Sequence, residues 1–241
     1  MKTVKRLKII LIILLLLVMT LSGHKIILYY KGNKENEEIK KEIIENYIEE
    51  VDTTEEEVKY EVDFESLKKE NPDTVGYLKV NGTNIDYVVV KGSDNSFYLK
   101  HSFNRSYNIS GWIFADFHNQ FNGYDKNIVI FGHNTLDGSM FGSLKNVLTK
   151  EWQENSNNHK VLFITEDGEN IYEVFSVYTV LSEDYYIKTQ FNDDFDKFIE
   201  IIKKRSIYDF KVDVDENDKV LTLSTCTSDR IHRVVLHAKK S

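Results

Sequence analysis

The sequence predicts a mainly β domain with flanking helices, closed into an eight-stranded barrel. From Gly76 onward, eight short apolar segments are separated by turn residues, which is typical of a barrel built from many short strands. Asn81 and Gly82, between the first two segments, are a strong signal for a tight hairpin. The expected strands are residues 76–80, 84–90, 112–116, 127–131, 160–165, 170–181, 219–226 and 232–238.

Helices are expected before and between these strands. Apolar residues recur at helical spacing over 33–57, although a solvated charged stalk is the alternative there. A short second helix begins at the N-cap residue Asp63 and stops before Pro72. Residues 140–148 and 193–204 predict two further helices, and the latter lies just before the penultimate strand.

The N-terminus has the pattern of a membrane anchor. Residues 1–8 are basic and residues 9–23 carry no charge, as in an export signal. Fifteen uncharged residues are short for a span of about 20, but the apolar residues 26–30 complete the length. Because no small-x-small cleavage site precedes Lys25, we expect an uncleaved anchor over 9–30 rather than a removed signal peptide.

The chain is therefore divided into a cytoplasmic basic segment (1–8), a membrane anchor (9–30), a charged helical linker (31–60) and a β-barrel domain (61–241). The formal net charge is −8. The first 25 residues hold five of the 31 basic residues and none of the 39 acidic ones, so the remainder has 26 basic against 39 acidic residues, a balance of −13. This excess of negative charge argues against nucleic acid as a partner.

Cys226 is the only cysteine, and it ends the expected strand 219–226. An exported protein with one cysteine cannot form an internal disulfide. The thiol is therefore either buried as a small hydrophobic group or kept for its reactivity. A reactive thiol needs a basic partner, because only a few per cent of an unperturbed thiol is ionised at neutral pH.

His133 and Arg233 are the candidate partners of this thiol. His133 follows an apolar strand and the flexible Gly132, so it also lies at a strand end, and distant strand ends can meet on one rim of a barrel. Acyl transfer builds negative charge on a carbonyl oxygen. The Arg233 guanidinium, seven residues after Cys226, could stabilise that charge by about 3 kcal/mol.

No metal or other cofactor is expected. One cysteine and scattered histidines lack the paired spacing of a zinc site, and no Gly-rich phosphate loop is visible. No carboxylate lies at a spacing that supports a Cys-His-Asp triad, although Asp116 is a possible orienting acid.

These residues resemble those of the sortases, the membrane-anchored cysteine transpeptidases of Gram-positive bacteria. The resemblance rests on the anchor, on Gly132-His133, and on residues 222–226 with Arg233 downstream. Within the family the chain is most similar to class B over roughly residues 60–240, and the stretches that carry this are 71–80, 94–99 and 111–116. Phe131 departs from the class, in which a tyrosine is frequent at that place.

The resemblance implies that His133, Cys226 and Arg233 are catalytic. Cys226 would attack the threonine carbonyl of an Asn-Pro-x-Thr or Ser-Pro-x-Thr sorting signal at the C-terminus of a surface protein. An amine of peptidoglycan, from a precursor or a cross-bridge, would then resolve the thioacyl enzyme. The residues expected to contact the signal are Asn95, Leu99, Ser182, Tyr186, Ile187 and Ser224. The protein is expected in the cell membrane as a single-pass protein with its catalytic domain outside.

Two other functions are compatible with parts of this pattern. An exported cysteine peptidase of the papain type shares Cys and His, but there the cysteine precedes the histidine, and here the order is reversed. A membrane-tethered β-domain that binds wall components without catalysis would not need Cys226.

Within the sortase family, the alternative is a pilus-polymerising sortase. Such an enzyme would carry a lid with an Asp-Pro-aromatic motif, whereas Pro72 is the only proline of this chain.

Overall fold

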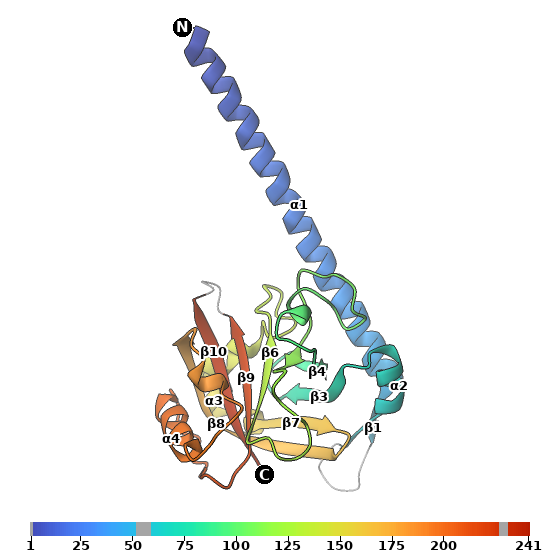
Figure 1. Ribbon diagram of the computed structural model, residues 1–241, viewed down its shortest axis with the longest axis vertical. Coiled ribbons are helices and arrows are strands. Elements are labelled where there is room, and N and C mark those ends of the chain that lie inside the picture. The colour runs from blue at the N-terminus through green and yellow to red at the C-terminus, as the bar shows by residue number, and fades with distance from the viewer. Residues whose placement is uncertain (1, 52–58, 227–230) are drawn as a thin grey trace.

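Helix α1 (Lys2–Tyr47) runs without a break from the apolar N-terminal segment into a β-barrel (Figure 1). The computed structural model describes residues 2–51, 59–226 and 231–241. Ile43 of α1 is buried in the core, and Ile39 and Tyr47 pack beside it. The apolar spacing of this segment therefore corresponds to an amphipathic helix that leans on the domain, and the alternative of a solvated stalk was wrong.

The expectation of a helix through residue 57 was wrong for its last part. Strand β1 (Ile48–Val51) follows α1 directly and pairs antiparallel with β2 (Lys59–Val62). Ile48 and Val51 are β-branched and favour extended backbone, and Ile48 still packs against the core from the strand. Residues 52–58, which include the end of the expected helix, lie outside the described residues.

Eight strands of the described chain form a closed barrel in the order β10-β8-β7-β3-β4-β5-β6-β9. The strands are β3 (Thr74–Val80), β4 (Asp86–Val90), β5 (Phe114–Ala115), β6 (Asn127–Gly132), β7 (Lys160–Thr165), β8 (Gly168–Leu181), β9 (Val220–Cys226) and β10 (His232–Lys240). The pairs β4–β5 and β6–β9 are parallel, and the other pairs are antiparallel. The predicted barrel is confirmed.

Short helices fill the connections. They are α2 (Phe64–Glu70), α3 (Lys150–Glu154), α4 (Phe195–Arg205) and the 3₁₀ helices η1 (Phe97–Leu99), η2 (Leu144–Leu148), η3 (Ser156–His159) and η4 (Tyr185–Ile187). The side chain of Asp63 caps α2 by accepting a hydrogen bond from the Ser66 amide, as its sequence predicts. Helix α4 matches the helix expected before the penultimate strand.

Two expected elements are shorter than the sequence suggested. The strand at 112–116 is reduced to β5, because the Trp112 amide donates to the carbonyl of Tyr98 in η1 and not to a neighbouring strand. The helix at 140–148 is reduced to η2, because Met140 has a φ of 47° and cannot belong to a right-handed helix.

Alternation along β9 and β10 separates the barrel interior from a covered outer face. Leu223 and Leu236 belong to the main core, whereas Ser224 and Val235 have the opposite orientation. The connection from β8 to β9 passes over this outer face (Figure 1), with η4 packing on Val235 and α4 forming its own apolar cluster below. Cys226 ends β9, two residues after Ser224.

Candidate active site

Three neighbouring strand ends bring the predicted catalytic residues together. In the parallel pair β6–β9, Gly132 lies beside Thr225. The next residue after each of these is His133, which follows β6, and Cys226, which ends β9. In the antiparallel pair β9–β10, Arg233 lies directly opposite Cys226. Adjacent strands are about 4.8 Å apart. The backbone of Cys226 is therefore flanked by His133 on one side and Arg233 on the other, although the three are far apart in the sequence.

The imidazole of His133 is oriented by a backbone carbonyl. Its Nε2 atom lies 2.8 Å from the carbonyl oxygen of Leu99, at the end of η1. Because a carbonyl only accepts hydrogen bonds, Nε2 carries a proton in this contact. In the neutral ring the basic nitrogen is then Nδ1, which is the atom that can take up a proton.

Gly111 allows the contact between His133 and the Leu99 carbonyl. The sequence analysis did not identify Gly111 as a residue of the site. A Cβ atom on Gly111 would lie 2.4 Å from the Tyr98 carbonyl oxygen, 2.9 Å from that of Leu99 and 3.0 Å from Cδ2 of His133. Its φ of 59° also favours glycine. The absence of a side chain at Gly111 thus lets the Leu99 carbonyl and the His133 ring approach each other. The sequence held no signal for this contact, because it joins segments that only the fold brings together.

Arg233 is the second residue of β10, lies on the covered outer face and is half-buried. Its Nη1 atom donates to the carbonyl oxygen of His232 at 2.9 Å. On its other side, Arg233 is paired with Val180 of β8. The backbone of Arg233 is therefore fixed by pairing with both β8 and β9, and this limits the directions in which the guanidinium can donate hydrogen bonds.

Four of the expected substrate contacts lie on β9 or on the connection between β8 and β9. The hydroxyls of Tyr186 and Ser224 are 3.2 Å apart, and both side chains are buried. Ile187 is half-buried and packs in the same cluster. Ser182 is exposed at the end of β8, where its amide donates to the Ile231 carbonyl at 2.9 Å. Ser182, Tyr186 and Ile187 thus belong to the β8–β9 connection, whereas Ser224 belongs to β9.

The other two expected contacts lie on the loop before β5. The amide group of Asn95 donates to Asp116 at 2.8 Å and accepts from the Phe117 amide at 3.0 Å. The Leu99 side chain is exposed, while its carbonyl holds His133. Asp116 does not orient His133. One of its oxygens instead lies 2.7 Å from Nδ1 of His118.

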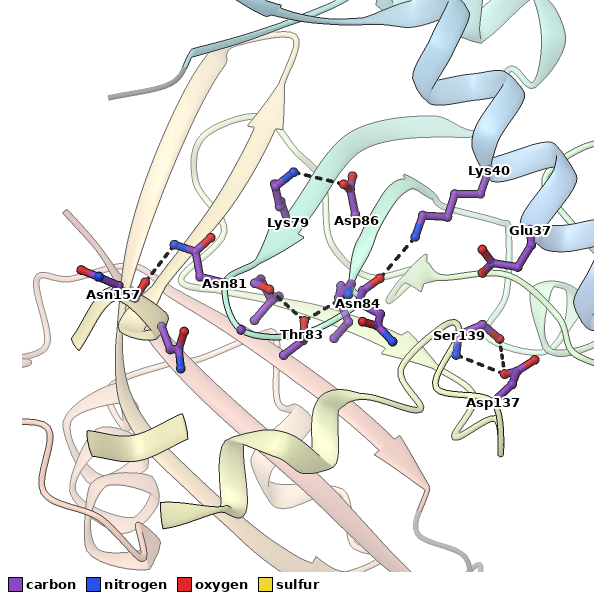
Figure 2. A pocket seen from close by; sticks show the side chains of 14 residues that line it. Glu37, Lys40, Lys79, Asn81, Thr83, Asn84, Asp86, Asp137, Ser139 and Asn157 are labelled. Carbon is purple, nitrogen blue, oxygen red and sulfur yellow. Dashed lines mark hydrogen bonds and ion pairs between the residues drawn. The ribbon is translucent and has the colours of Figure 1, made fainter. Parts of the chain in front are cut away.

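Figure 2 shows a pocket of about 680 Å³ between α1 and the turn that joins β3 and β4. Its polar groups bind one another, as where Lys40 donates to the Asn84 carbonyl at 3.3 Å and Lys79 pairs with Asp86 at 3.1 Å. None of the described residues that line it is a histidine or a cysteine. Across the described part of the chain, no group of three or more His, Cys, Asp or Glu residues could hold a metal ion.

A closed eight-stranded barrel with a single cysteine at the end of one strand, next to a histidine and an arginine at neighbouring strand ends, defines a β-barrel cysteine transpeptidase. Comparison with known proteins agrees. A family model described as the sortase domain matches residues 78–241. The chain is 34% identical over 229 residues to sortase B of Listeria monocytogenes, which covers 92% of each chain.

It is also 36% identical over 182 residues to sortase B of Staphylococcus aureus, which covers 73% of each chain. The crystal structure of sortase B from Bacillus anthracis in complex with AAEK1 is similar with a TM-score of 0.77 at 31% identity, over 88% of this chain and 98% of that one. The chain belongs to the sortase family, and its relatives are class B enzymes. This confirms the resemblance read from the sequence and favours a transpeptidase over the two other functions.

Proposed function

We propose that Cys226, His133 and Arg233 carry out the transpeptidation, with a sorting signal of the Asn-Pro-x-Thr or Ser-Pro-x-Thr kind as acyl donor. The observation that carries the proposal is the strand register, which sets Cys226 between His133 and Arg233. A thiol beside a base and a fixed cation is the arrangement that acyl transfer requires.

In the first half of the reaction, the Cys226 thiolate attacks the threonine carbonyl carbon. The carbonyl oxygen becomes negatively charged, and the Arg233 guanidinium donates hydrogen bonds to it. When the intermediate collapses, the C–N bond breaks and protonated His133 gives its proton to the departing amine. The products are a thioester on Cys226, neutral His133 and a free peptide amine.

In the second half, a primary amine of the cell wall attacks the thioester carbonyl carbon. Neutral His133 takes a proton from the attacking amine through Nδ1, while Nε2 keeps its hydrogen bond to Leu99. The C–S bond breaks, Cys226 leaves as a thiolate, and a new amide is formed. A sortase B that is 36% identical to this chain has been solved in complex with triglycine, which supports a glycine-type amine as one acceptor to test.

We assign the recognition of the signal to Asn95, Leu99, Ser182, Tyr186, Ile187 and Ser224. Staphylococcus aureus sortase B, 34% identical to this chain, has been solved as a substrate complex. The hydroxyl pair of Tyr186 and Ser224 supports a role for the β8–β9 connection, because it joins that connection to β9 two residues before Cys226. Tyr186→Phe and Ser224→Ala each remove one hydroxyl. We expect each to raise KM about threefold, and the double variant to cost no more than the larger single effect.

Mass spectrometry of the full chain in detergent micelles tests the chemistry. The protein is incubated with a set of Asn-Pro-x-Thr and Ser-Pro-x-Thr peptides, with and without triglycine. We expect an adduct on Cys226 whose mass corresponds to the acyl part ending in threonine, and a ligated product when triglycine is present. Cys226→Ala is the control. The absence of an adduct from every peptide would contradict this specificity.

We further propose that α1 anchors the enzyme as a single-pass protein with the barrel outside. Among the described residues, α1 is a helix long and apolar enough to cross a bilayer. The basic residues of 1–8 favour a cytoplasmic N-terminus. Tyr124 is exposed on the barrel, so Tyr124→Cys in a Cys226→Ala background should react with a membrane-impermeant maleimide on intact cells. Labelling only after lysis would mean the opposite orientation.

A further inference from the structure

Helix α1 leaves the barrel at the rim that carries the candidate active site. Figure 1 shows the free part of α1 extending from the same side of the molecule toward which the ends of β6 and β9 point. His133 follows the end of β6, and Cys226 ends β9. The candidate active site and the apolar segment of α1 therefore face the same side.

Polar contacts fix α1 to two loops of this rim. Asn33 donates to Asp137 at 2.6 Å, in the loop that follows His133. Asn36 donates to the Gly111 carbonyl at 2.9 Å, and Asn108 donates to the Gly32 carbonyl at the same distance. Asn33, Asn36 and Asn108 are all buried. Because these amides are satisfied inside the interface, α1 and the rim behave as one rigid unit down to residue 32.

The end of the apolar segment defines the level of the membrane surface. Residues 9–30 make 22 residues, or about 33 Å of helix at about 1.5 Å per residue, which is close to the hydrocarbon thickness of a bilayer. Tyr29 and Tyr30 end this segment, and tyrosine is enriched where hydrocarbon meets the headgroups. The hydroxyl of Tyr29 accepts a hydrogen bond from the Leu136 amide at 2.8 Å. Leu136 therefore lies at the depth of the membrane surface.

Exposed apolar side chains surround α1 at this level. Leu136 is 80% exposed at the tip of the loop after His133. Tyr107 and Ile109, which are 67% and 38% exposed, flank Asn108 in the second loop. With Tyr30 they form a set of four apolar residues, here called the collar. Single exposed apolar residues are ordinary, but four of them around the exit of an apolar helix form a patch.

We propose that the collar is a second membrane contact, in which Leu136, Tyr107 and Ile109 insert into the headgroup region of a phospholipid bilayer beside the anchor. The proposal rests on the membrane anchoring proposed above. It means that the rim with His133 and Cys226 opens toward the bilayer surface and not toward the bulk of the cell wall. The loop that follows His133 is then held on one side by α1 and on the other by lipid.

Tryptophan fluorescence tests this contact directly. Leu136→Trp is made in the full chain and reconstituted into vesicles of phosphatidylethanolamine and phosphatidylglycerol, with or without bromine on the acyl chains. The two native tryptophans, Trp112 and Trp152, are buried, so the spectrum of the unsubstituted protein can be subtracted. We expect the brominated lipid to remove more than half of the added emission.

Two matched variants make the result decisive. Tyr124→Trp carries the indole on an 86% exposed position before β6, at the end opposite to His133, and should not be quenched. Leu16→Trp, inside the apolar segment, reports whether the anchor itself is inserted.

Quenching at positions 16 and 136 without quenching at 124 supports the proposal. Quenching at 16 alone overturns it while leaving the anchor intact. Absence of quenching at 16 overturns the anchor and the collar contact together. An emission shift of Leu136→Trp that depends on protein concentration in detergent micelles, without quenching in brominated vesicles, assigns the collar to a second copy of the chain and also overturns the proposal.

Discussion

Arg233 lies directly opposite Cys226 in the antiparallel register of β9 and β10. In an antiparallel pair, directly opposite residues have Cα atoms about 5 Å apart. The position of the guanidinium relative to Cys226 is therefore set by the backbone of two paired strands, and a substitution at Arg233 changes the chemical group without moving its origin.

Arg233→Met is expected to lower kcat by about 100-fold to 1000-fold with a small change in KM, because donors to the developing oxyanion act mainly in the transition state. Arg233→Lys keeps the charge but loses the planar set of donors, so its loss should be intermediate. Steady-state kinetics with a labelled sorting peptide give both constants. Lys239→Met, on the same strand but at its other end, is the control and should keep full activity.

Gly111→Ala should damage activity more than stability. The new Cβ would meet the Tyr98 and Leu99 carbonyl oxygens and so move the group that orients His133. Gly123→Ala is the matched control, because Gly123 also has a positive φ, of 80°, but faces open space. Both variants lose about 1–2 kcal/mol from the left-handed backbone, and Gly111→Ala loses more stability than Gly123→Ala because two backbone carbonyl oxygens must shift.

Only Gly111→Ala should also lose activity, by at least tenfold in kcat. Thermal unfolding and peptide kinetics measured side by side separate the two effects. Equal kcat values for both variants would mean that the Leu99 contact does not orient the imidazole.

Asn36→Ala should weaken the attachment of α1. It leaves the Gly111 carbonyl without its Asn36 donor in a buried interface, and it removes one of the two acceptors of the Asn108 amide, which keeps the Gly32 carbonyl. Each unsatisfied buried group costs about 1–3 kcal/mol. We expect a lower midpoint of thermal unfolding in detergent micelles and faster cleavage of α1 in limited proteolysis. Lys34→Ala, an exposed position on the same helix, should change neither measurement by more than the error.

His237 should make the protein sensitive to mild acid. Burial, and after it the nearby Arg205 guanidinium, lowers the pKa of His237 to about 3. The ring accepts a hydrogen bond from one hydroxyl partner and donates to the other, since Nδ1 lies 2.8 Å from the Thr222 hydroxyl and Nε2 lies 2.8 Å from the Tyr178 hydroxyl. An unfolded histidine has a pKa near 6.5. Between these two values the unfolded state binds a proton that the folded state does not.

The contribution of neutral His237 to the free energy of unfolding is therefore fully present above pH 6.5, and it is lost progressively as the pH falls toward 3. At pH 5 this one group should cost on the order of 2 kcal/mol of the free energy of unfolding. Urea unfolding at pH 7 and pH 5 measures the change. His237→Gln cannot titrate, so its difference between the two pH values should be smaller by about that amount. An equal difference in both proteins would contradict the assignment.

The sequence was sufficient for the positions of the strands along the chain and for the idea that His133 and Cys226 meet at one rim. Both followed from local patterns, since β-branched runs between turn residues specify strands whatever surrounds them. It was insufficient for residues 48–51, where the same apolar spacing suits the end of a helix or a strand, and tertiary pairing with β2 decides. It was also insufficient for Gly111 and for the Leu99 carbonyl, because backbone groups act there without a chemical signature in the sequence.

The assignment of Asp116 as a possible orienting acid shows a related limit. The residue type was suitable and the position after a strand was reasonable. Its carboxylate nevertheless binds Asn95 and His118, because β5 runs antiparallel to β6 and sets Asp116 beside Val129, away from the end of β6. The orienting group of His133 is a main-chain carbonyl from η1.

The parallel pair β6–β9 joins His133 to Cys226 across 93 positions of the sequence. Between them the chain must complete β7, β8 and α4 before β9 can take its place beside β6. In a chain whose barrel has not closed, the two residues are therefore not neighbours. The proposed chemistry thus depends on completion of the whole fold and not on any local segment.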